Sequence, residues 1–167
     1  MEKNKIKIIN FNASYEVPNY KYDAKRNLIH WGSDNAYPDY LLDVYNAYGS
    51  TTHKAIVNRK TKLTAGQGWK DVQSPELEQF IKDNNLNKEV RKVSLDYELY
   101  NGFALEIIWN REGTEISSVS HVPFHKLRIG IESEEIPFEH YWYSDDWSKY
   151  KKPENEPNMY RAWNPYV

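Results

Sequence analysis

Two histidines four residues apart, His121 and His125, could bind a metal ion if they lay on a helix. That spacing would place both imidazoles on one helical face, where a divalent metal could coordinate them. Pro123 lies between them, however, and proline lacks the N–H that a helix interior requires. We therefore interpret both histidines as ordinary residues at the end of a hairpin.

Adjacent carboxylates at Asp145 and Asp146 are the second candidate for chemistry. Together with Glu139 or Glu154 they could hold metal ions or cleave a glycosidic bond. Together with His140 they could form a hydrolase site, provided that these side chains converge in one cleft. Neighbouring aspartates more often form a turn or cap a helix, and we adopt that interpretation.

The remaining motifs lack essential parts. Gly66-Gln67-Gly68 has neither the third glycine nor the Lys-Ser/Thr pair of a phosphate-binding loop, and it follows a predicted helix instead of a strand. No serine lies in a Gly-x-Ser-x-Gly elbow. The sequence thus predicts no catalytic constellation, and we expect a protein that is not an enzyme and uses no cofactor or metal.

One polar stripe indicates a contact surface. Lys54, Asn58 and Lys62 share one face of a predicted helix. Such a stripe could follow phosphates, each contact adding a salt-dependent contribution to affinity. The net charge of −2 favours the alternative, which is a solvated face or a contact with acidic residues of a neighbouring subunit.

A motif-like cluster occupies residues 31–38. Its polar members, Asp34 and Asn35, are typical turn and cap formers. We interpret its aromatic members as anchors that pin an amino-terminal arm to the body of the protein, and a ligand site is the alternative. The cluster consists of Trp31, Asp34, Asn35, Tyr37 and Pro38.

Four helices are predicted before the sheet. The second carries Ile56, Leu63 and the stem of Lys60 on one face, and the third has Leu77, Phe80 and Ile81 facing inward. Each has a start signal and most have a glycine stop. The starts are Pro38, Ser50 or Thr51, Ser74-Pro75 and a cap at Asn87, and the stops are Gly49, Gly66 and Asn101-Gly102.

Residues 103–109 and 115–122 predict a hairpin, because both are rich in apolar positions and the four residues from Asn110 to Gly113 have turn chemistry. Pro123 interrupts the ladder, and residues 126–131 alternate as a third strand. Residues 5–11 alternate weakly as a further strand, whereas residues 13–26 are irregular. We predict an α+β fold in which several helices pack on a small, mostly antiparallel sheet, with an extended amino-terminal arm.

The chain divides into an amino-terminal strand and arm (1–29), an α+β domain (30–148) and a proline-rich segment (149–167), in which residues 159–163 are at best a short edge strand. Its 167 residues suit one core of ordinary size. Fourteen tyrosines and six tryptophans are a marked excess, and such residues supply large contact areas at interfaces. No segment approaches the roughly 18 apolar residues of a membrane span, so we expect no membrane partner.

Three segments follow one another in an order that is typical of one protein family. A helix ends at Asn-Gly and runs into "FALEIIWNREG", a hairpin return and "VPFHKLRIG". Residues 30–69 precede this, with Trp-Gly-x-Asp-Asn-x-Tyr-Pro near their start and Gly-x-Gly-Trp at their end, and "YWYSDDWSKY" follows it. Over residues 30–150 the chain thus resembles the wing region of tailed-bacteriophage portal proteins, in particular those of phages and prophages of the Bacteroidetes.

The resemblance implies a structural subunit of a homo-oligomeric ring, usually of about twelve copies, at one capsid vertex. In that family the ring is the conduit for DNA packaging and ejection, and it contacts terminase, neck or adaptor and capsid proteins. DNA passes through it without sequence recognition. The resemblance places the protein in the virion, and in the bacterial host cytoplasm during assembly. Family members continue into a stem, clip and crown, so we expect this chain to be an amino-terminal fragment or a truncated relative.

A second interpretation is a small aromatic-rich binding module for carbohydrate or peptide, without catalysis. Trp142, Tyr143, Trp147 and Tyr150 would form its platform if they were exposed on an open sheet face. Burial of the same rings, under the helices or against an arm, would favour the portal interpretation.

Overall fold

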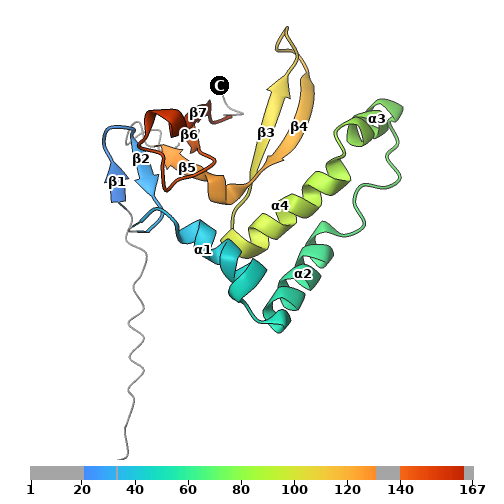
Figure 1. Ribbon diagram of the computed structural model, residues 1–167. Coiled ribbons are helices and arrows are strands. Elements are labelled where there is room, and N and C mark those ends of the chain that lie inside the picture. Colours follow the sequence, from blue (N-terminus) through green and yellow to red (C-terminus); the bar gives the residue numbers. More distant parts are fainter. Residues whose placement is uncertain (1–20, 33, 131–139, 164–167) are drawn as a thin grey trace, which may run out of the picture.

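The computed structural model describes residues 21–32, 34–130 and 140–163, and Figure 1 shows how they are arranged. They form α-helices and two antiparallel sheets, one of five strands and one of two. The predicted α+β class is therefore confirmed. The strand predicted at residues 5–11 and the arm up to residue 20 lie outside the described residues.

Helix starts follow the predicted caps in two cases. The Ser50 hydroxyl accepts the N–H of His53 at 3.1 Å, and the Ser74 hydroxyl accepts the N–H of Leu77 at 3.3 Å. Among the described residues the helices are α1 (Tyr37–Asp43), which continues as the π-helix η1 (Val44–Tyr48), α2 (Thr51–Ala65), α3 (Pro75–Asp83) and α4 (Leu86–Tyr100).

The fourth helix differs from its prediction at one end. It begins at Leu86 after Asn85, so Asn87 is not its cap. The Asn87 side chain instead accepts the N–H of Trp69 at 2.8 Å, which ties the α2–α3 connection to α4. The predicted stop is confirmed, because α4 ends at Asn101 in a left-handed conformation with φ 59°.

The apolar face predicted for α2 is exposed. Ile56 and Leu63 are 55% and 73% exposed, whereas Val57 and Ala65 are the buried residues of this helix. Leu77 of α3 is also half exposed, and Ile81 is buried as predicted. The buried sides of α2 and α3 are thus determined by their contacts with α4, and the larger side chains remain outside.

The predicted hairpin is present as β3 (Ala104–Trp109) and β4 (Ile116–Val122). Ala104 pairs with Val122 at its base, and the register shifts at Trp109 near the turn. These two strands form a separate sheet. The third strand predicted beside them belongs to the other sheet, because Pro123 and the 3-10 turn η2 (Phe124–Lys126) redirect the chain.

The five-stranded sheet draws on both ends of the described chain. Its order is β1-β2-β5-β6-β7, and every neighbouring pair is antiparallel. The interpretation of residues 13–26 as irregular is wrong for residues 21–23, which form the edge strand β1. The strands are β1 (Lys21–Asp23), β2 (Leu28–His30), β5 (Leu127–Gly130), β6 (His140–Tyr143) and β7 (Asn158–Arg161).

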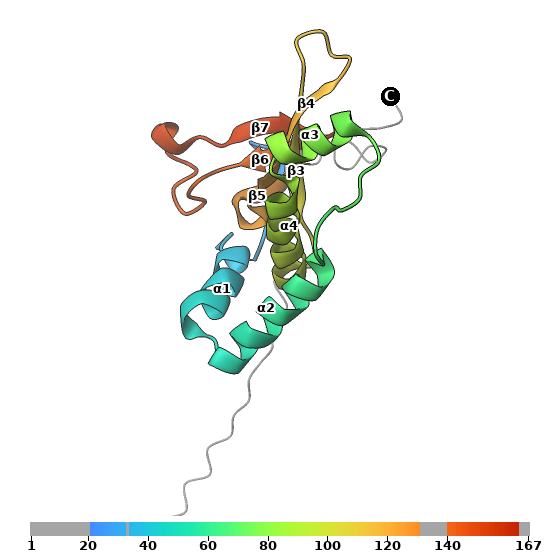
Figure 2. The same ribbon diagram turned by 90° about the vertical axis from the view of Figure 1, so that its right-hand side faces the viewer.

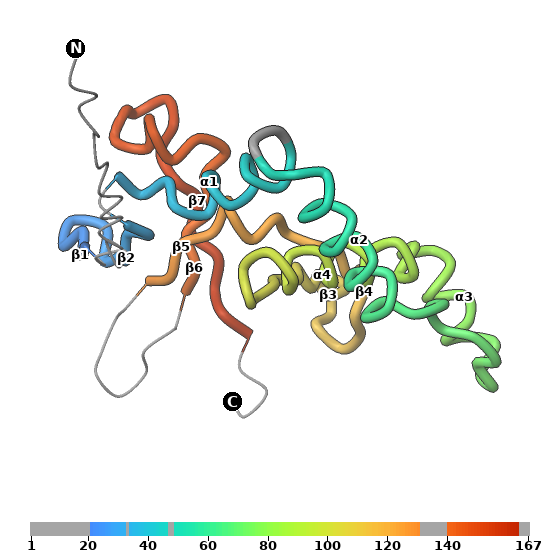
Figure 3. The backbone as a smooth tube through the Cα atoms, turned by 90° about the horizontal axis from the view of Figure 1, so that it is seen from below, coloured from blue at the N-terminus to red at the C-terminus, as the bar shows by residue number. Residues whose placement is uncertain are grey.

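The helices and the larger sheet lie side by side. Figure 3 shows the β1–β2 hairpin at one end of the molecule and α3 at the other. The α4 helix lies between the β3–β4 hairpin and α2 in both Figure 1 and Figure 2. Leu28, Trp147 and Tyr150 form a buried cluster against the larger sheet. The chain leaves the larger sheet after β2, forms the helices and the β3–β4 hairpin, and returns to the larger sheet at β5.

Candidate functional site

A fully buried arginine, Arg128 of β5, holds the larger sheet to the turn that precedes α1. Its Nε donates to the side-chain oxygen of Asn35, and its Nη2 donates to the Asn35 carbonyl. Its Nη1 donates to the carbonyls of His125 and Leu127, each at 2.7 Å. The guanidinium also lies over the Trp147 ring, 4.6 Å from the ring centre. One side chain thus joins residues 35, 125, 127 and 147.

The charge of Arg128 is balanced by dipoles and a ring instead of a carboxylate. Among the described residues, no carboxylate oxygen lies within 4.0 Å of its nitrogens. Burial lowers the pKa of the Arg128 guanidinium to about 10, although the charge of Asp39 acts in the opposite direction. The side chain therefore remains a cation at neutral pH, and removing any of its acceptors leaves a buried charge less well solvated.

The backbone conformation of Asn35 suits it to accept hydrogen bonds from Arg128. It has φ 63°, a left-handed conformation that asparagine adopts more readily than most residues. Its buried side-chain oxygen accepts the Trp31 N–H at 3.0 Å as well as Arg128 Nε. Asp34 accepts the Ala36 N–H at 3.1 Å and a hydrogen bond from the Tyr40 hydroxyl. These carboxylate and amide contacts close the turn before α1, in which Pro38 is buried.

Aromatic rings complete this junction. Phe124 of η2 packs edge-on against Trp31 at 6.0 Å and stacks on Tyr100 at 5.6 Å between ring centres. A methyl group at Gly102 would come within 2.9 Å of the Phe124 ring. Gly102, which follows the Asn101 stop of α4, therefore allows the close approach of η2. The predicted anchoring of an arm by Trp31 stays a prediction, because residues 1–20 lie outside the described structure.

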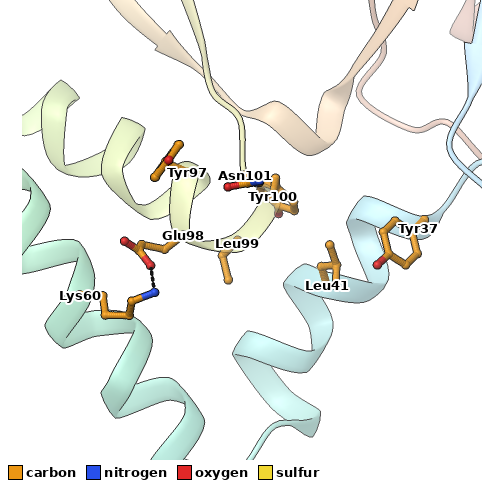
Figure 4. A pocket seen from close by; sticks show the side chains of 8 residues that line it. All are labelled: Tyr37, Leu41, Lys60, Tyr97, Glu98, Leu99, Tyr100 and Asn101. Atoms are coloured by element: carbon orange, nitrogen blue, oxygen red, sulfur yellow. Dashed lines mark ion pairs between the residues drawn. The ribbon is translucent and has the colours of Figure 1, made fainter.

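A cleft of about 530 Å³ flanks the junction between α1, α2 and the end of α4 (Figure 4). Lys60 Nζ lies 2.7 Å from Glu98 Oε2 at one side of it. The Tyr100 hydroxyl is buried and has no hydrogen-bond partner among the described residues, and burial raises its pKa. The lining of the cleft mixes aromatic and apolar side chains with charged and amide ones. Its lining is Tyr37, Leu41, Lys60, Tyr97, Glu98, Leu99, Tyr100 and Asn101.

The predicted polar stripe on α2 is partly occupied by its own chain. The Tyr45 hydroxyl of η1 donates to Asn58 at 2.6 Å, and Lys54 Nζ lies 5.1 Å from the centre of the Tyr45 ring. Lys62 is exposed. Two of the three residues therefore contact η1, and the contact surface predicted for them stays a prediction.

Two buried acids of α4 were not singled out by the sequence. Asp96 accepts the Phe124 N–H at 2.9 Å, and its Oδ2 lies 2.6 Å from His121 Nε2. Glu89 accepts the His121 N–H at 2.8 Å. Asn84, just after α3, accepts the Val119 N–H at 3.1 Å. Asn84 and Glu89 thus satisfy alternate N–H groups along the edge of β4 that faces away from β3. Asp96 joins His121 and the start of η2 to α4, so this Asp–His pair has a structural role.

The groups considered for a hydrolase do not converge. Asp145 lies 2.5 Å from Lys126 Nζ, and Asp146 lies 2.8 Å from Lys149 Nζ. His140 is buried and packs edge-on against Trp142. The described part of the chain holds no group of three or more histidine, cysteine or acidic side chains placed to bind a metal. Within the same part, no helix is long and apolar enough to cross a membrane.

The arrangement can therefore fix the larger sheet to the turn before α1, and it can present the cleft between α1, α2 and α4 beside this contact. It joins the Trp-Gly-x-Asp-Asn-x-Tyr-Pro motif to the Leu-Arg strand through Asn35 and Arg128. Comparison with known protein families, with curated proteins and with solved structures finds no match for this chain.

Proposed function

We propose that this protein is a structural, non-catalytic subunit of a phage portal ring, acting in DNA packaging and ejection at the capsid vertex. The proposal starts from the resemblance of residues 30–150 to portal wing regions. One observation supports it above the others. Of the four aromatic residues that could have formed a binding platform, Trp147 and Tyr150 are buried, and Trp142 and Tyr143 are half-buried.

Trp147 and Tyr150 are buried in one cluster with Leu28. The Tyr150 hydroxyl donates to Asp23 at 3.1 Å and lies 2.9 Å from His30 Nε2. These rings therefore pin the β1–β2 hairpin to the rest of the sheet. A carbohydrate or peptide module built on them would need the same rings exposed, so we place the portal role first.

Exposed apolar side chains elsewhere also support a subunit that is completed by neighbours. A monomer rarely leaves many large apolar residues exposed on adjacent elements, and such surfaces commonly mark protein interfaces. The β3–β4 hairpin and the segment leading into it expose five of them, and α2 exposes two. They are Phe103, Leu105, Ile108, Trp109 and Ile116 on the hairpin, and Ile56 and Leu63 on α2.

Native mass spectrometry of the assembly isolated from its natural source tests this proposal. A portal ring predicts a single species of about a dozen identical subunits, with a central channel in negative-stain images. Dilution at moderate salt controls for non-specific association. A strictly monomeric protein across the accessible concentration range would contradict the proposed role.

A further inference from the structure

We propose that the β3–β4 hairpin of one copy docks on the exposed face of α2 in the next copy. This inference rests on the proposed ring function and deepens it, because it names the two surfaces that meet. The occupant of each surface is thus a second copy of this chain. Three features of the described structure lead to this pairing: exposed apolar side chains, opposite charge and position.

The first surface, here called the hairpin surface, consists of Phe103, Leu105, Ile108, Trp109 and Ile116. Each of these side chains is at least 40% exposed, although the strands that carry most of them form a regular ladder. A two-stranded ribbon is marginally stable unless something packs on it. Asn84 and Glu89 accept N–H groups along one edge of β4, and the five apolar side chains of the hairpin surface stay exposed.

The second surface, here called the α2 stripe, consists of Ile56, Arg59 and Leu63. These residues are separated by three and four positions, so they follow one another along a single side of the helix. That side lies opposite the buried Val57 and Ala65. Leu63 has the highest exposed fraction among the large apolar residues described. The stripe is therefore an unpartnered helix face in the single copy.

Charge favours the pairing of these two surfaces. Helix α2 carries four cationic side chains and no acidic one, and only Lys60 forms an ion pair within the described structure. The hairpin region, residues 103–122, carries three glutamates against a single arginine. Opposite charge steers two surfaces together and disfavours like-with-like contacts. A hairpin-to-hairpin or α2-to-α2 dimer would place like charges together.

The positions of the hairpin surface and the α2 stripe determine which kind of assembly their contact forms. The hairpin and α2 lie on opposite sides of α4 in Figure 1, and α4 contacts both α2 and β4. A contact between two different surfaces of the same chain is heterologous, so it propagates from copy to copy and closes into a ring or continues as a filament. The hairpin-to-α2 contact thus supplies the head-to-tail geometry that a ring requires.

Cysteine cross-linking tests the pairing directly, because the chain has no cysteine of its own. Leu63→Cys and Leu105→Cys variants are mixed and treated with a short bismaleimide cross-linker. Leu77→Cys replaces Leu105→Cys in the matched control, since Leu77 is similarly exposed on α3. We expect mixed dimers from the 63 and 105 pair, little product from the 63 and 77 pair, and little from either variant alone.

Charge reversal provides the second measurement. Arg59→Glu with Lys62→Glu should lower the yield of the 63 and 105 product roughly tenfold, and added salt should lower the wild-type yield. Lys82→Glu on α3 is the matched control and should leave the yield unchanged. Circular dichroism confirms that each variant keeps its helices.

Equal yields from the 105 and 77 variants, or homodimers as the main product, would overturn the pairing. If the natural assembly forms a ring but the Leu63→Cys and Leu105→Cys variants are not cross-linked to each other, this inference is overturned and the proposed function stays intact. A natural assembly that stays monomeric would instead contradict the proposed function.

Discussion

Substitution of Asn35 tests whether the buried Arg128 charge holds the two parts of the fold together. The Asn35 side-chain oxygen accepts from Arg128 Nε, whereas its Nδ2 is buried without a hydrogen-bond partner. Asn35→Ala removes the acceptor and also places an alanine at φ 63°. Asn35→Gly removes the acceptor but tolerates the backbone. Asn35→Asp keeps an acceptor, adds a negative charge beside the guanidinium and removes the unpartnered donor.

The magnitudes follow from these contacts. A hydrogen bond to a charged group contributes about 1.5–3 kcal/mol. A left-handed conformation costs about 1–2 kcal/mol for most residues. We therefore expect Asn35→Ala to lower the free energy of unfolding by about 3–4 kcal/mol and Asn35→Gly by about 2 kcal/mol, from a total of roughly 5–15 kcal/mol for a domain of this kind.

Asn35→Asp should act in the opposite direction. Two charges 4 Å apart attract by about 4 kcal/mol at an effective dielectric constant of 20. Desolvation of the new carboxylate offsets most of this attraction, and loss of the buried unpartnered donor adds about 1 kcal/mol. We expect a net gain of about 1–2 kcal/mol at neutral pH. The guanidinium lowers the folded-state pKa of the introduced carboxyl, so the gain is present above its unfolded pKa of about 4 and is lost as pH falls through the folded value.

Urea unfolding followed by tryptophan fluorescence measures all three variants. The midpoint should fall for Asn35→Ala, fall less for Asn35→Gly and rise for Asn35→Asp, with an unchanged dependence on urea. Repeating the Asn35→Asp measurement at pH 3 should remove its advantage over the wild type. If Asn35→Asp were as unstable as Asn35→Ala, the charge of Arg128 would not be what Asn35 stabilises, and the reasoning would fail.

Three further substitutions test the neighbouring contacts. Gly102→Ala should lower the free energy of unfolding by about 1–3 kcal/mol, because its methyl group would meet the Phe124 ring; equal urea midpoints would contradict the close approach. Tyr150→Phe should lower it by about 1–2 kcal/mol through loss of the hydroxyl contacts that include His30, and calorimetry would refute this by showing an unchanged melting temperature. Burial lowers the folded-state pKa of His125, so stability should fall as pH drops from 7 to 5, and less so for His125→Asn; parallel pH profiles would refute it.

Local signals in the sequence predicted the elements that depend on local chemistry. Ser50 and Ser74 cap helices by accepting a nearby N–H, and Asn101 stops α4 in a left-handed conformation. The β3–β4 hairpin follows from an apolar run and an alternating run on either side of a turn. These features need only a few consecutive residues, so a reader of the sequence can recognise them.

Pairings over long sequence distances were not predictable in the same way. The strands β1, β2 and β6 have only three or four residues each, too few for a period to stand out, whereas the edge strand β7 overlaps the short strand considered at residues 159–163. Their partners lie up to about a hundred residues away, as the pairing of Leu28 with Gly130 shows. The exposed face of α2 was also missed, since the side that is buried is set by the contact with α4.

The contact between Asn35 and Arg128 shows a further limit of prediction from sequence patterns. The sequence shows Asn35 as a turn former and Arg128 as an alternating polar residue of a strand, and each interpretation is locally reasonable. Neither indicates that the arginine is fully buried against the asparagine, 93 positions away. A buried cation within a strand could be suspected only from a structure in which its acceptors are visible.

The polar face of α4 explains why the hairpin stands apart from the larger sheet. The outer edge of β4 presents N–H groups that a third strand would normally accept. Asn84 and Glu89 accept the N–H groups of Val119 and His121 in its place, and Asp96 accepts that of Phe124 where the chain turns away. With that edge satisfied by Asn84 and by side chains of α4, the next strand is free to join the larger sheet, and apolar side chains of the ribbon remain exposed.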